Sequence, residues 1–378
     1  MKFSFWKIFA LATVVSVIAA TGAKAEPRFK TKKPLVQVAL LLDTSNSMDG
    51  LINQAKSQLW RIVNEFNHSR QDGEVPEVQV ALFEYGNNGL SAQAGWIRKI
   101  SDFTTDLDLI SEKLFALRTN GGEEYCGWVI KDALERLEWS PSSRAYKAIF
   151  IAGNEPFTQG PVDYTDPCKS ARARGIIVNT IHCGDERTGV ETMWRDGARL
   201  GDGKYLVIDQ DRAVAYVEAP QDKEIARLSR ELNNTYLAYG SAGKEGYTRQ
   251  EMQDRNAATV AASGALVERS VAKASPNYNN GSWDLVDASK NKDFKLDAVK
   301  ESDLPATMQA LPPAERQEFL EQKSKERAGL QAKINELNAE REKFVAAQMQ
   351  ASGATNTLDR VVVVTVHEQA QVRGFTFE

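Results

Sequence analysis

The sequence of 378 residues is long enough for two or three domains. Its 47 Lys and Arg residues are nearly balanced by 51 Asp and Glu residues, which gives a formal net charge of −4. A chain without a basic excess lacks the electrostatic footprint of a nucleic-acid-binding protein, so we exclude nucleic acid as the expected partner. After the N-terminal segment, no apolar run reaches the roughly 20 residues of a transmembrane helix.

The first 25 residues have the pattern of a secretory signal peptide. Lys2 and Lys7 form a charged start, Ile8 to Ala20 is a short apolar segment, and Ala23-Lys24-Ala25 is a small-x-small cleavage site. We expect cleavage after Ala25. Because the signal looks bacterial and no cysteine follows it as a lipid attachment point, we expect a periplasmic or secreted protein.

Residues 34–235 alternate between predicted strands and predicted helices. The runs VQVALLL and VQVALFEY are typical of strands that are buried on both faces of a sheet. The predicted strands cover residues 36–42, 78–85, 96–103, 148–152, 176–181 and 205–208. The predicted helices cover residues 51–66, 106–117, 125–138, 191–200 and 223–232, with another beginning near Pro167. This order predicts an α/β domain with a doubly wound, mostly parallel sheet of about six strands, in which 96–103 is an edge strand.

The composition changes after residue 235. The glycines between Gly240 and Gly246 predict a flexible junction, and residues 245–378 predict a mainly helical C-terminal domain with helices at about 249–274 and 314–349. The second helix has a poorly filled heptad pattern, so we expect it to pack on the first as a hairpin; a coiled coil that joins two copies of the chain is the alternative. The β-branched run RVVVVTVH at 360–367 predicts a paired strand.

The most informative motif is Asp43-Thr44-Ser45-Asn46-Ser47, directly after the first strand. Ligands of open α/β sheets bind at the carboxyl ends of the strands. One carboxylate and two hydroxyls at alternate positions are hard oxygen ligands, which favour Mg²⁺, or Ca²⁺ or Mn²⁺ in its place. The alternative without a metal is that the serines cap the next helix while Asp43 bonds to the loop backbone.

This Asp-x-Ser-x-Ser motif resembles the metal-ion-dependent adhesion site of von Willebrand factor type A domains. The order of elements over residues 34–235 is also similar to theirs, including the strand at 176–181 and the late helix followed by Gly203-Lys204-Tyr205. The resemblance implies that Asp43, Ser45 and Ser47 hold a divalent metal. It also implies a protein partner whose acidic side chain takes the last coordination position.

A second loop contributes a Thr ligand in that family, and here the corresponding positions are Glu123 and Glu124. We expect Glu123 to be a metal ligand, because a carboxylate is a better oxygen ligand than a hydroxyl. It would also neutralise the cation and weaken its attraction for a partner's carboxylate. The alternative is that both residues only favour the start of the helix at 125–138.

The loop after the fourth strand contributes an Asp in many members of the family, but Gly153 occupies that position here. Asn154, Glu155 and Glu124 are therefore expected as substitute ligands or partner contacts. Phe157 follows in the same loop. It is either an exposed contact residue beside the site or a buried anchor of the loop.

The three cysteines are Cys126, Cys168 and Cys183. An odd count allows one disulfide and one free thiol in an oxidising compartment, and three buried thiols are the alternative. In the type A resemblance all three fall near the same rim of the domain, and Cys126 with Cys168 is the simplest pair.

No nucleophile elbow, zinc-protease helix or phosphate loop is present. His182 and Cys183 are neighbours on one strand and should point to opposite faces, which argues against a catalytic pair. We therefore expect an exported, non-enzymatic protein that binds a protein partner through a metal site. The alternative is a structural or scaffold protein of the envelope, with a vestigial metal site, that acts through its C-terminal helical region.

Overall fold

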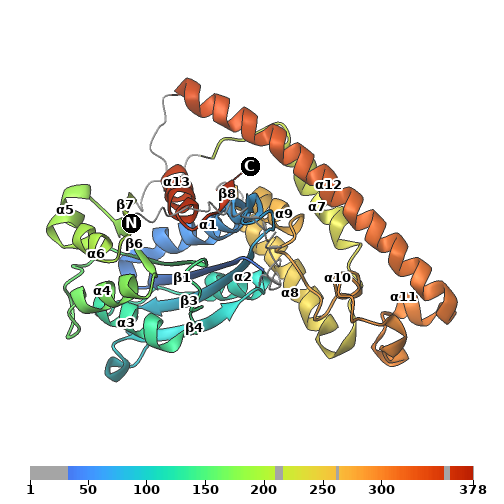
Figure 1. The fold of residues 1–378 in the computed structure, drawn as a ribbon, viewed down its shortest axis with the longest axis horizontal. Helices are drawn as coiled ribbons and strands as arrows, with labels where there is room; N and C mark the ends of the chain where they lie inside the picture. Colours follow the sequence, from blue (N-terminus) through green and yellow to red (C-terminus); the bar gives the residue numbers. More distant parts are fainter. Residues whose placement is uncertain (1–32, 209–215, 261–263, 353–357, 378) are drawn as a thin grey trace, which may run out of the picture. The chain divides into compact units, whose positions relative to one another are not determined.

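A six-stranded sheet forms the centre of the computed structural model, which describes residues 33–208, 216–260, 264–352 and 358–377 (Figure 1). The strand order is β4-β3-β1-β5-β6-β7, and β4 alone in this sheet pairs antiparallel with its neighbour. The strands are β1 (Leu35–Asp43), β3 (Glu77–Tyr85), β4 (Ile97–Thr104), β5 (Tyr146–Gly153), β6 (Ile177–Cys183) and β7 (Tyr205–Ile208). The predicted doubly wound α/β architecture is confirmed, with β4 at an edge as expected.

Helices cover both faces of the sheet, which explains why its central strand is apolar throughout. Alternate residues of β1 belong to two different core clusters: Val38 and Leu40 face one side, whereas Ala39 and Leu41 face the other. One face is covered by α1 (Asp49–Asn67) and α2 (Leu107–Ala116), and the opposite face by α3 (Cys126–Arg136), α4 (Thr165–Ala173) and α6 (Trp194–Leu200). Each fully buried Leu or Val stabilises the fold by about 1.5–3 kcal/mol.

The helix predicted at 191–200 is two helices in the structure, α5 (Glu186–Glu191) and α6. The break lies at Met193, whose φ of 72° is left-handed and ends the run of helical hydrogen bonds. This turn directs Trp194 into the core, where its side chain is fully buried.

The predicted flexible junction at Gly240 to Gly246 is wrong, because these residues begin a helix, α8 (Gly240–Thr259). The glycines allow close packing there. A β-carbon on Gly246 would lie 2.4 Å from the ring of Trp283, so only glycine permits this contact. The helix predicted at 249–274 is divided into α8 and α9 (Ala265–Lys273).

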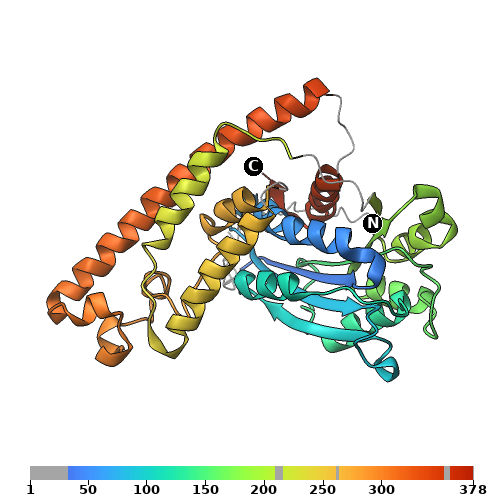
Figure 2. The same ribbon diagram turned by 180° about the vertical axis from the view of Figure 1, so that it is seen from behind.

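The longest helix, α12 (Pro313–Ser352), matches the helix predicted at 314–349. It packs along α7 (Asp222–Asn233) and also contacts α9 and the short α10 (Leu285–Ala288), so its main partner differs from the expected 249–274 helix (Figures 1 and 2). Its inward face carries buried Leu320 and Ile334. Buried Arg327 on the same face pairs with Asp284, with 2.6 Å between Nη1 and Oδ2.

The strand predicted at 360–367 is wrong, because these residues lie in a helix, α13 (Leu358–Gln371). Val362, Val366 and Ala370 repeat at a spacing of four and are buried against α1 and β7, whereas Val364 is 44% exposed. Burial of one helical face therefore outweighs the β-propensity of the valines. The chain then ends in a two-residue strand, β8 (Thr376–Phe377), which pairs with β2 (Ser69–Arg70).

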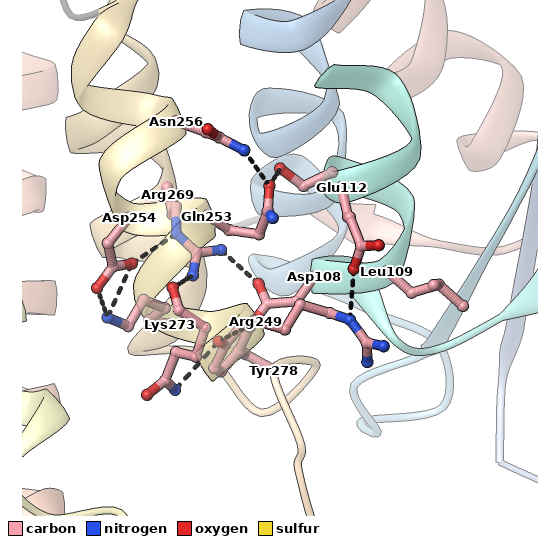
Figure 3. A network of polar contacts seen from close by, with 12 residues as sticks. Asp108, Leu109, Glu112, Arg249, Gln253, Asp254, Asn256, Arg269, Lys273 and Tyr278 are labelled. Atoms are coloured by element: carbon pink, nitrogen blue, oxygen red, sulfur yellow. Dashed lines mark hydrogen bonds and ion pairs between the residues drawn. The ribbon is translucent and has the colours of Figure 1, made fainter. Parts of the chain in front are cut away.

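The region predicted as a separate C-terminal domain packs directly on the sheet domain, and the chain from Lys33 onward forms one compact unit. Helix α9 lies against α1, and α8 lies against α2. Figure 3 shows the buried polar network between them, in which Arg269 contacts both Asp108 and Asp254. The predicted signal peptide lies outside the described residues. In the part of the chain that is described, no helix has the length and apolar character needed to cross a membrane.

Candidate functional site

The carboxyl end of β1 carries the first predicted site residue, Asp43, in the middle of the sheet. Asp43 is fully buried, and its Oδ1 accepts a hydrogen bond of 2.7 Å from the backbone N–H of Ser45. Its other oxygen, Oδ2, is also buried and has no hydrogen-bond partner. An unpartnered buried carboxylate oxygen is costly, so this atom marks a position where a positively charged or donating group is missing.

The two serines of the motif follow Asp43 in a short turn before α1. Ser45 is buried, and its side chain lies close enough to the carboxyl groups of Asp43 and Glu124 to lower the pKa of each. The backbone of Ser47 lies in a short 3-10 helix, Asn46–Met48. The side chain of Ser47 is outside the described part of the structure.

The second predicted loop, Asn120 to Gly127, brings Glu124 to Asp43. The backbone N–H of Asn120 donates to Thr44 O at 2.9 Å, which ties the loop to the end of β1. Gly86 marks how closely the two carboxyl groups approach. A β-carbon on this glycine would lie 2.8 Å from Asp43 Oδ1 and 2.8 Å from Glu124 Cγ, and its φ of +79° also favours glycine.

The two neighbouring glutamates of this loop point in different directions. Glu124 is buried beside Asp43, whereas Glu123 is exposed and accepts a hydrogen bond of 3.3 Å from Gln159 Nε2. The other amide atom of Gln159, Oε1, accepts from the backbone N–H of Glu124 at 2.8 Å. Gln159 thus fixes the turn that separates the two carboxylates. Sequence reasoning missed it, because nothing in its local sequence distinguishes it from other loop glutamines.

Gly153, at the end of β5, leaves no room for the aspartate that the family resemblance implies. A β-carbon there would lie 2.6 Å from the hydroxyl of Tyr85 and 3.0 Å from Asp43 Oδ2. The Tyr85 hydroxyl is held in this place because it donates to Ala152 O at 2.9 Å. Tyr85 therefore occupies the space of that side chain. The pairing of β1 with β3 could have identified it, because Tyr85 lies opposite Asp43.

The remaining candidates of the third loop have different environments. Asn154 has a buried Oδ1 without a hydrogen-bond partner, and Glu155 is half-buried. Phe157 is fully buried and packs on the rings of Tyr164 and Trp194, so the expectation that it is an exposed partner contact is wrong. Its apolar ring anchors the loop in the core.

The carboxyl groups of this edge lie close enough together to repel one another when they are charged. Burial raises the pKa of Asp43 to about 7, and the nearby charge of Glu155 adds to the effect. Burial, followed by the charges of Asp43 and Glu155, raises the pKa of Glu124 to about 8. Among the described residues, no Lys, Arg or His forms an ion pair with Asp43 or Glu124.

The donor set fits a hard cation. Carboxylate and hydroxyl oxygens converge at Asp43, Ser45 and Glu124, and such oxygens suit Mg²⁺, Ca²⁺ or Mn²⁺. Within the described ranges, no three His, Cys, Asp or Glu side chains are grouped as a ligand set. A cation here therefore depends on the hydroxyls as well as on the two carboxylates.

The cysteines are free thiols, and the predicted disulfide between Cys126 and Cys168 is absent. All three are buried, and burial raises their pKa values, which keeps the sulfur atoms protonated. Cys126 lies under the site, with its Sγ 3.7 Å from the hydroxyl of Tyr85. Packing in the apolar core therefore explains these residues.

His182 and Cys183 lie on opposite faces of β6, as the alternation of a strand requires. His182 is buried and contacts the ring of Trp194, whereas Cys183 belongs to the core cluster on the other face. Burial lowers the pKa of His182. The two side chains do not form a pair.

Comparisons with known proteins agree with this architecture. Residues 37–193 match the family model of the von Willebrand factor type A domain. No curated protein sequence matches the chain. Similar solved structures include BatB, a conserved hypothetical protein from Bacteroides thetaiotaomicron, with 19% identity over 46% of this chain and 90% of that chain and a TM-score of 0.35.

Two further solved structures are similar to part of this chain. The type A domain of SpRpn10 has 17% identity over 46% of this chain and 88% of that chain, with a TM-score of 0.35. Proximal thread matrix protein 1 from the mussel byssus, solved with a zinc-occupied metal-ion-dependent adhesion motif, has 15% identity over 48% of this chain and 43% of that chain, with a TM-score of 0.35. The family match and the observed strand order together show that this chain contains a von Willebrand factor type A domain.

Proposed function

We propose that the type A domain binds a divalent cation, Mg²⁺ or in its place Ca²⁺ or Mn²⁺, at the carboxyl edge of the sheet. In this proposal Asp43, Ser45, Ser47 and Glu124 hold the ion. Asn154 and Glu155 are additional oxygen groups from the third loop. Glu124 replaces Glu123 in the ligand set because Glu124 is the buried member of the pair and adjoins Asp43.

One observation carries this proposal: the fully buried Asp43 has an oxygen without a partner beside a second buried carboxyl group. Two neighbouring carboxylates without a counter-charge are unfavourable in a folded protein. A bound cation supplies the opposite charge and accepts the free lone pairs of Asp43 Oδ2. The chain's own residues provide the oxygen cradle and, through Gln159, keep the Glu124 backbone in place.

We further propose that the cation site binds a protein partner and that the protein acts by binding rather than by catalysis. The family resemblance supports an acidic side chain of the partner as the group that completes the coordination. The N-terminal signal pattern supports export to the periplasm or beyond. Association of two copies through the C-terminal helices is a separate expectation, which the size of the purified protein in solution tests.

The metal proposal is tested by titrating the purified mature chain with Mg²⁺, Mn²⁺ and Ca²⁺ in a calorimeter. Glu124→Gln should weaken binding by at least tenfold, because it removes one of two buried carboxylates. Glu123→Gln is the matched control, since it makes the same change one residue away on an exposed side chain, and it should alter binding by less than about twofold. Equal losses in both variants, or no binding to the wild type, would reject the site.

The partner proposal is tested by capturing partners on the immobilised mature chain in Mg²⁺ and in EDTA. A specific partner should be lost in EDTA and with Asp43→Ala, and retained with Glu123→Gln. Capture that is unchanged in EDTA and with Asp43→Ala contradicts metal-dependent binding.

A scaffold function is the second candidate. It is favoured by the absence of a third acidic or nitrogen ligand among the described residues and by the loss of an aspartate at Gly153. In that case the wild-type protein binds no divalent cation, and truncation before α12 disrupts its assembly with envelope components while Asp43→Ala does not.

A further inference from the structure

Three cationic side chains lie near one another at the end of the sheet opposite Asp43, and none of them is paired with an acidic group among the described residues. Lys147 lies at the start of β5, Arg174 follows the end of α4, and Arg373 follows the end of α13. Within the described ranges, none of the three forms an ion pair with Asp or Glu. We call these residues the basic triad.

Gly175 adjoins two members of the triad, Arg373 and Lys147. A β-carbon on Gly175 would have two nitrogen atoms as its nearest non-neighbouring atoms, Arg373 Nη2 at 3.8 Å and Lys147 Nζ at 4.0 Å. The absence of a side chain keeps this space open between an ammonium and a guanidinium. The backbone φ of +66° makes glycine the favoured residue in this turn.

Each member of the triad is held in position by the surrounding fold. Lys147 is 5% exposed, and its Nζ donates to Ser140 O at 2.9 Å and to Arg174 O at 2.8 Å, which leaves one of its three N–H groups free. The Arg174 side chain donates from Nη1 to Leu134 O at 2.7 Å. These bonds use carbonyl oxygens and leave the positive charges uncompensated.

Arg373 is brought to this edge from the far end of the sequence. Its carbonyl oxygen accepts a hydrogen bond of 2.7 Å from the buried amide of Gln71, and Phe375, two residues later, is buried in the core. Its guanidinium makes no hydrogen bond with any described residue, so its donors are available to a ligand. Burial lowers the pKa of Lys147, and the charges of Arg373 and Arg174 lower it further.

We propose that Lys147, Arg174 and Arg373 form a binding site for a phosphate group. Three uncompensated cations match a doubly charged anion better than a single carboxylate. A guanidinium beside an ammonium provides the charge-assisted hydrogen bonds that phosphate oxygens accept. The group comes either from a free phosphate or phosphate ester, or from the headgroup of an anionic lipid. The site is separate from the proposed metal site and does not depend on it.

The test uses the full mature chain in a buffer that contains EDTA, at fixed ionic strength. EDTA keeps divalent cations out of the metal site, and the fixed ionic strength keeps the screening of charges constant. Inorganic phosphate is titrated into the protein, and vesicles of phosphatidylcholine with and without phosphatidic acid are tested separately for binding. Arg373→Gln removes the unpaired guanidinium and leaves the core residues unchanged. We expect it to weaken binding by about tenfold or more.

Arg144→Gln is the matched control. Arg144 lies at the same edge, where its carbonyl shares the Gln71 amide with Arg373, but its guanidinium is already paired with Asp72 at 2.5 Å. This variant should bind phosphate within about twofold of the wild type, and so should Asp43→Ala. Lys147→Met is measured as well, with its thermal unfolding temperature recorded, because Lys147 also satisfies two carbonyl groups.

The outcomes separate the possibilities. Binding of inorganic phosphate that Arg373→Gln weakens, and that Arg144→Gln does not, supports a site for a free phosphate group. Binding of phosphatidic acid vesicles alone, with the same dependence on Arg373, supports a lipid headgroup. The proposal is overturned if neither probe binds the wild type, or if Arg144→Gln weakens binding as much as Arg373→Gln does.

Discussion

Two pairs of carboxyl groups in this protein have opposite electrostatic surroundings. Asp108 and Asp254 are surrounded by Arg269 and Lys273, with contacts of 2.5 Å from Arg269 to Asp108 and 2.9 Å from Lys273 to Asp254 (Figure 3). The pair at the carboxyl edge, Asp43 and Glu124, forms no ion pair with a Lys or Arg of the described residues. Asp43, Glu124 and Asp108 are buried and Asp254 is largely buried, so burial alone does not explain the difference.

The comparison shows how a structural pair differs from a binding pair. In the network between the sheet domain and α8–α9, Lys273 and Arg269 overcome the effect of burial and hold the pKa of Asp254 at about 2. At the carboxyl edge burial prevails, and the pKa of Asp43 is raised to about 7. The chain supplies its own cations where two helices must be joined. It leaves the carboxylates free where, in our proposal, the cation comes from solution.

The largest effect should come from removing Arg269, the cation that contacts both Asp108 and Asp254. Arg269→Leu leaves Asp108 buried without its cationic partner and also removes the stacking of the guanidinium on the Trp60 ring, 4.8 Å from the ring centroid. We expect a loss of about 3–5 kcal/mol in the free energy of unfolding, measured with urea. A loss below about 1 kcal/mol would mean that the network does not join α9 to the sheet domain.

Asp43 and Glu124 should make the metal-free protein less stable as the pH rises. Folded-state pKa values of about 7 for Asp43 and about 8 for Glu124 lie above their ordinary values of 3.8 and 4.5. The folded state therefore keeps these protons while the unfolded state loses them, and stability falls between about pH 4 and pH 8.

For Asp43 the loss is on the order of 3 kcal/mol, which urea unfolding in EDTA at pH 5 and pH 8 can measure. Added Mg²⁺ should restore stability at pH 8 in the wild type. Glu124→Gln should reduce the pH dependence, whereas Glu123→Gln should leave it intact. A flat profile in EDTA would show that these carboxyl groups are not buried as described.

The stabilising effect of Asp254 should depend on pH in the opposite sense: it is lost as the pH falls. The folded-state pKa of Asp254, about 2, is below its ordinary value of 3.8, so its stabilising effect is present above about pH 4 and is lost as the pH falls through 2. This contribution is about 2 kcal/mol. The difference in unfolding free energy between the wild type and Asp254→Asn, measured at pH 6 and pH 3, should narrow at the lower pH. A constant difference would contradict the assignment.

The smallest effect is expected at the exposed margin of the same network. Arg249 contacts Glu112 at 2.6 Å and Glu245 at 2.7 Å, but these carboxylates are substantially exposed. Water and salt screen such pairs, so Arg249→Gln should lower the unfolding free energy by less than about 1 kcal/mol. A loss as large as that of Arg269→Leu would show that the network acts as one unit rather than through its buried part.

The family-specific parts of the site illustrate how far local sequence reaches. Asp43, Ser45 and the loop with two glutamates are recognisable because a buried strand ends at Asp43 and a glycine-rich loop precedes Glu123. The neighbouring residues in the sequence do not predict which glutamate turns inward, because this depends on Gln159, 35 residues further along the chain. In the same way, whether position 153 can hold an aspartate depends on the Tyr85 hydroxyl from another strand of the sheet.

The C-terminal region shows the same limit for secondary structure. The valine run near the C-terminus has strand propensity, yet α13 is a helix because Val362 and Val366 must both face α1 and the sheet. The glycines of α8 predict a flexible junction, yet Gly246 lies in a helix where the nearby ring of Trp283 leaves no room for a side chain. Local propensities of a fraction of a kcal/mol per residue are overruled by burial energies several times larger.

The sequence by itself determined the α/β order of elements, the doubly wound sheet and the position of the Asp-x-Ser-x-Ser motif at a strand end. Each of these follows from periodicity and strand-end chemistry over a few consecutive residues. Only the tertiary structure decided which buried charges have partners, because Asp108 meets Arg269, and Lys147 meets Arg373, across more than 150 residues of chain. Charge compensation is a property of the assembled fold, and it distinguishes the groups that join this protein together from those left to bind something else.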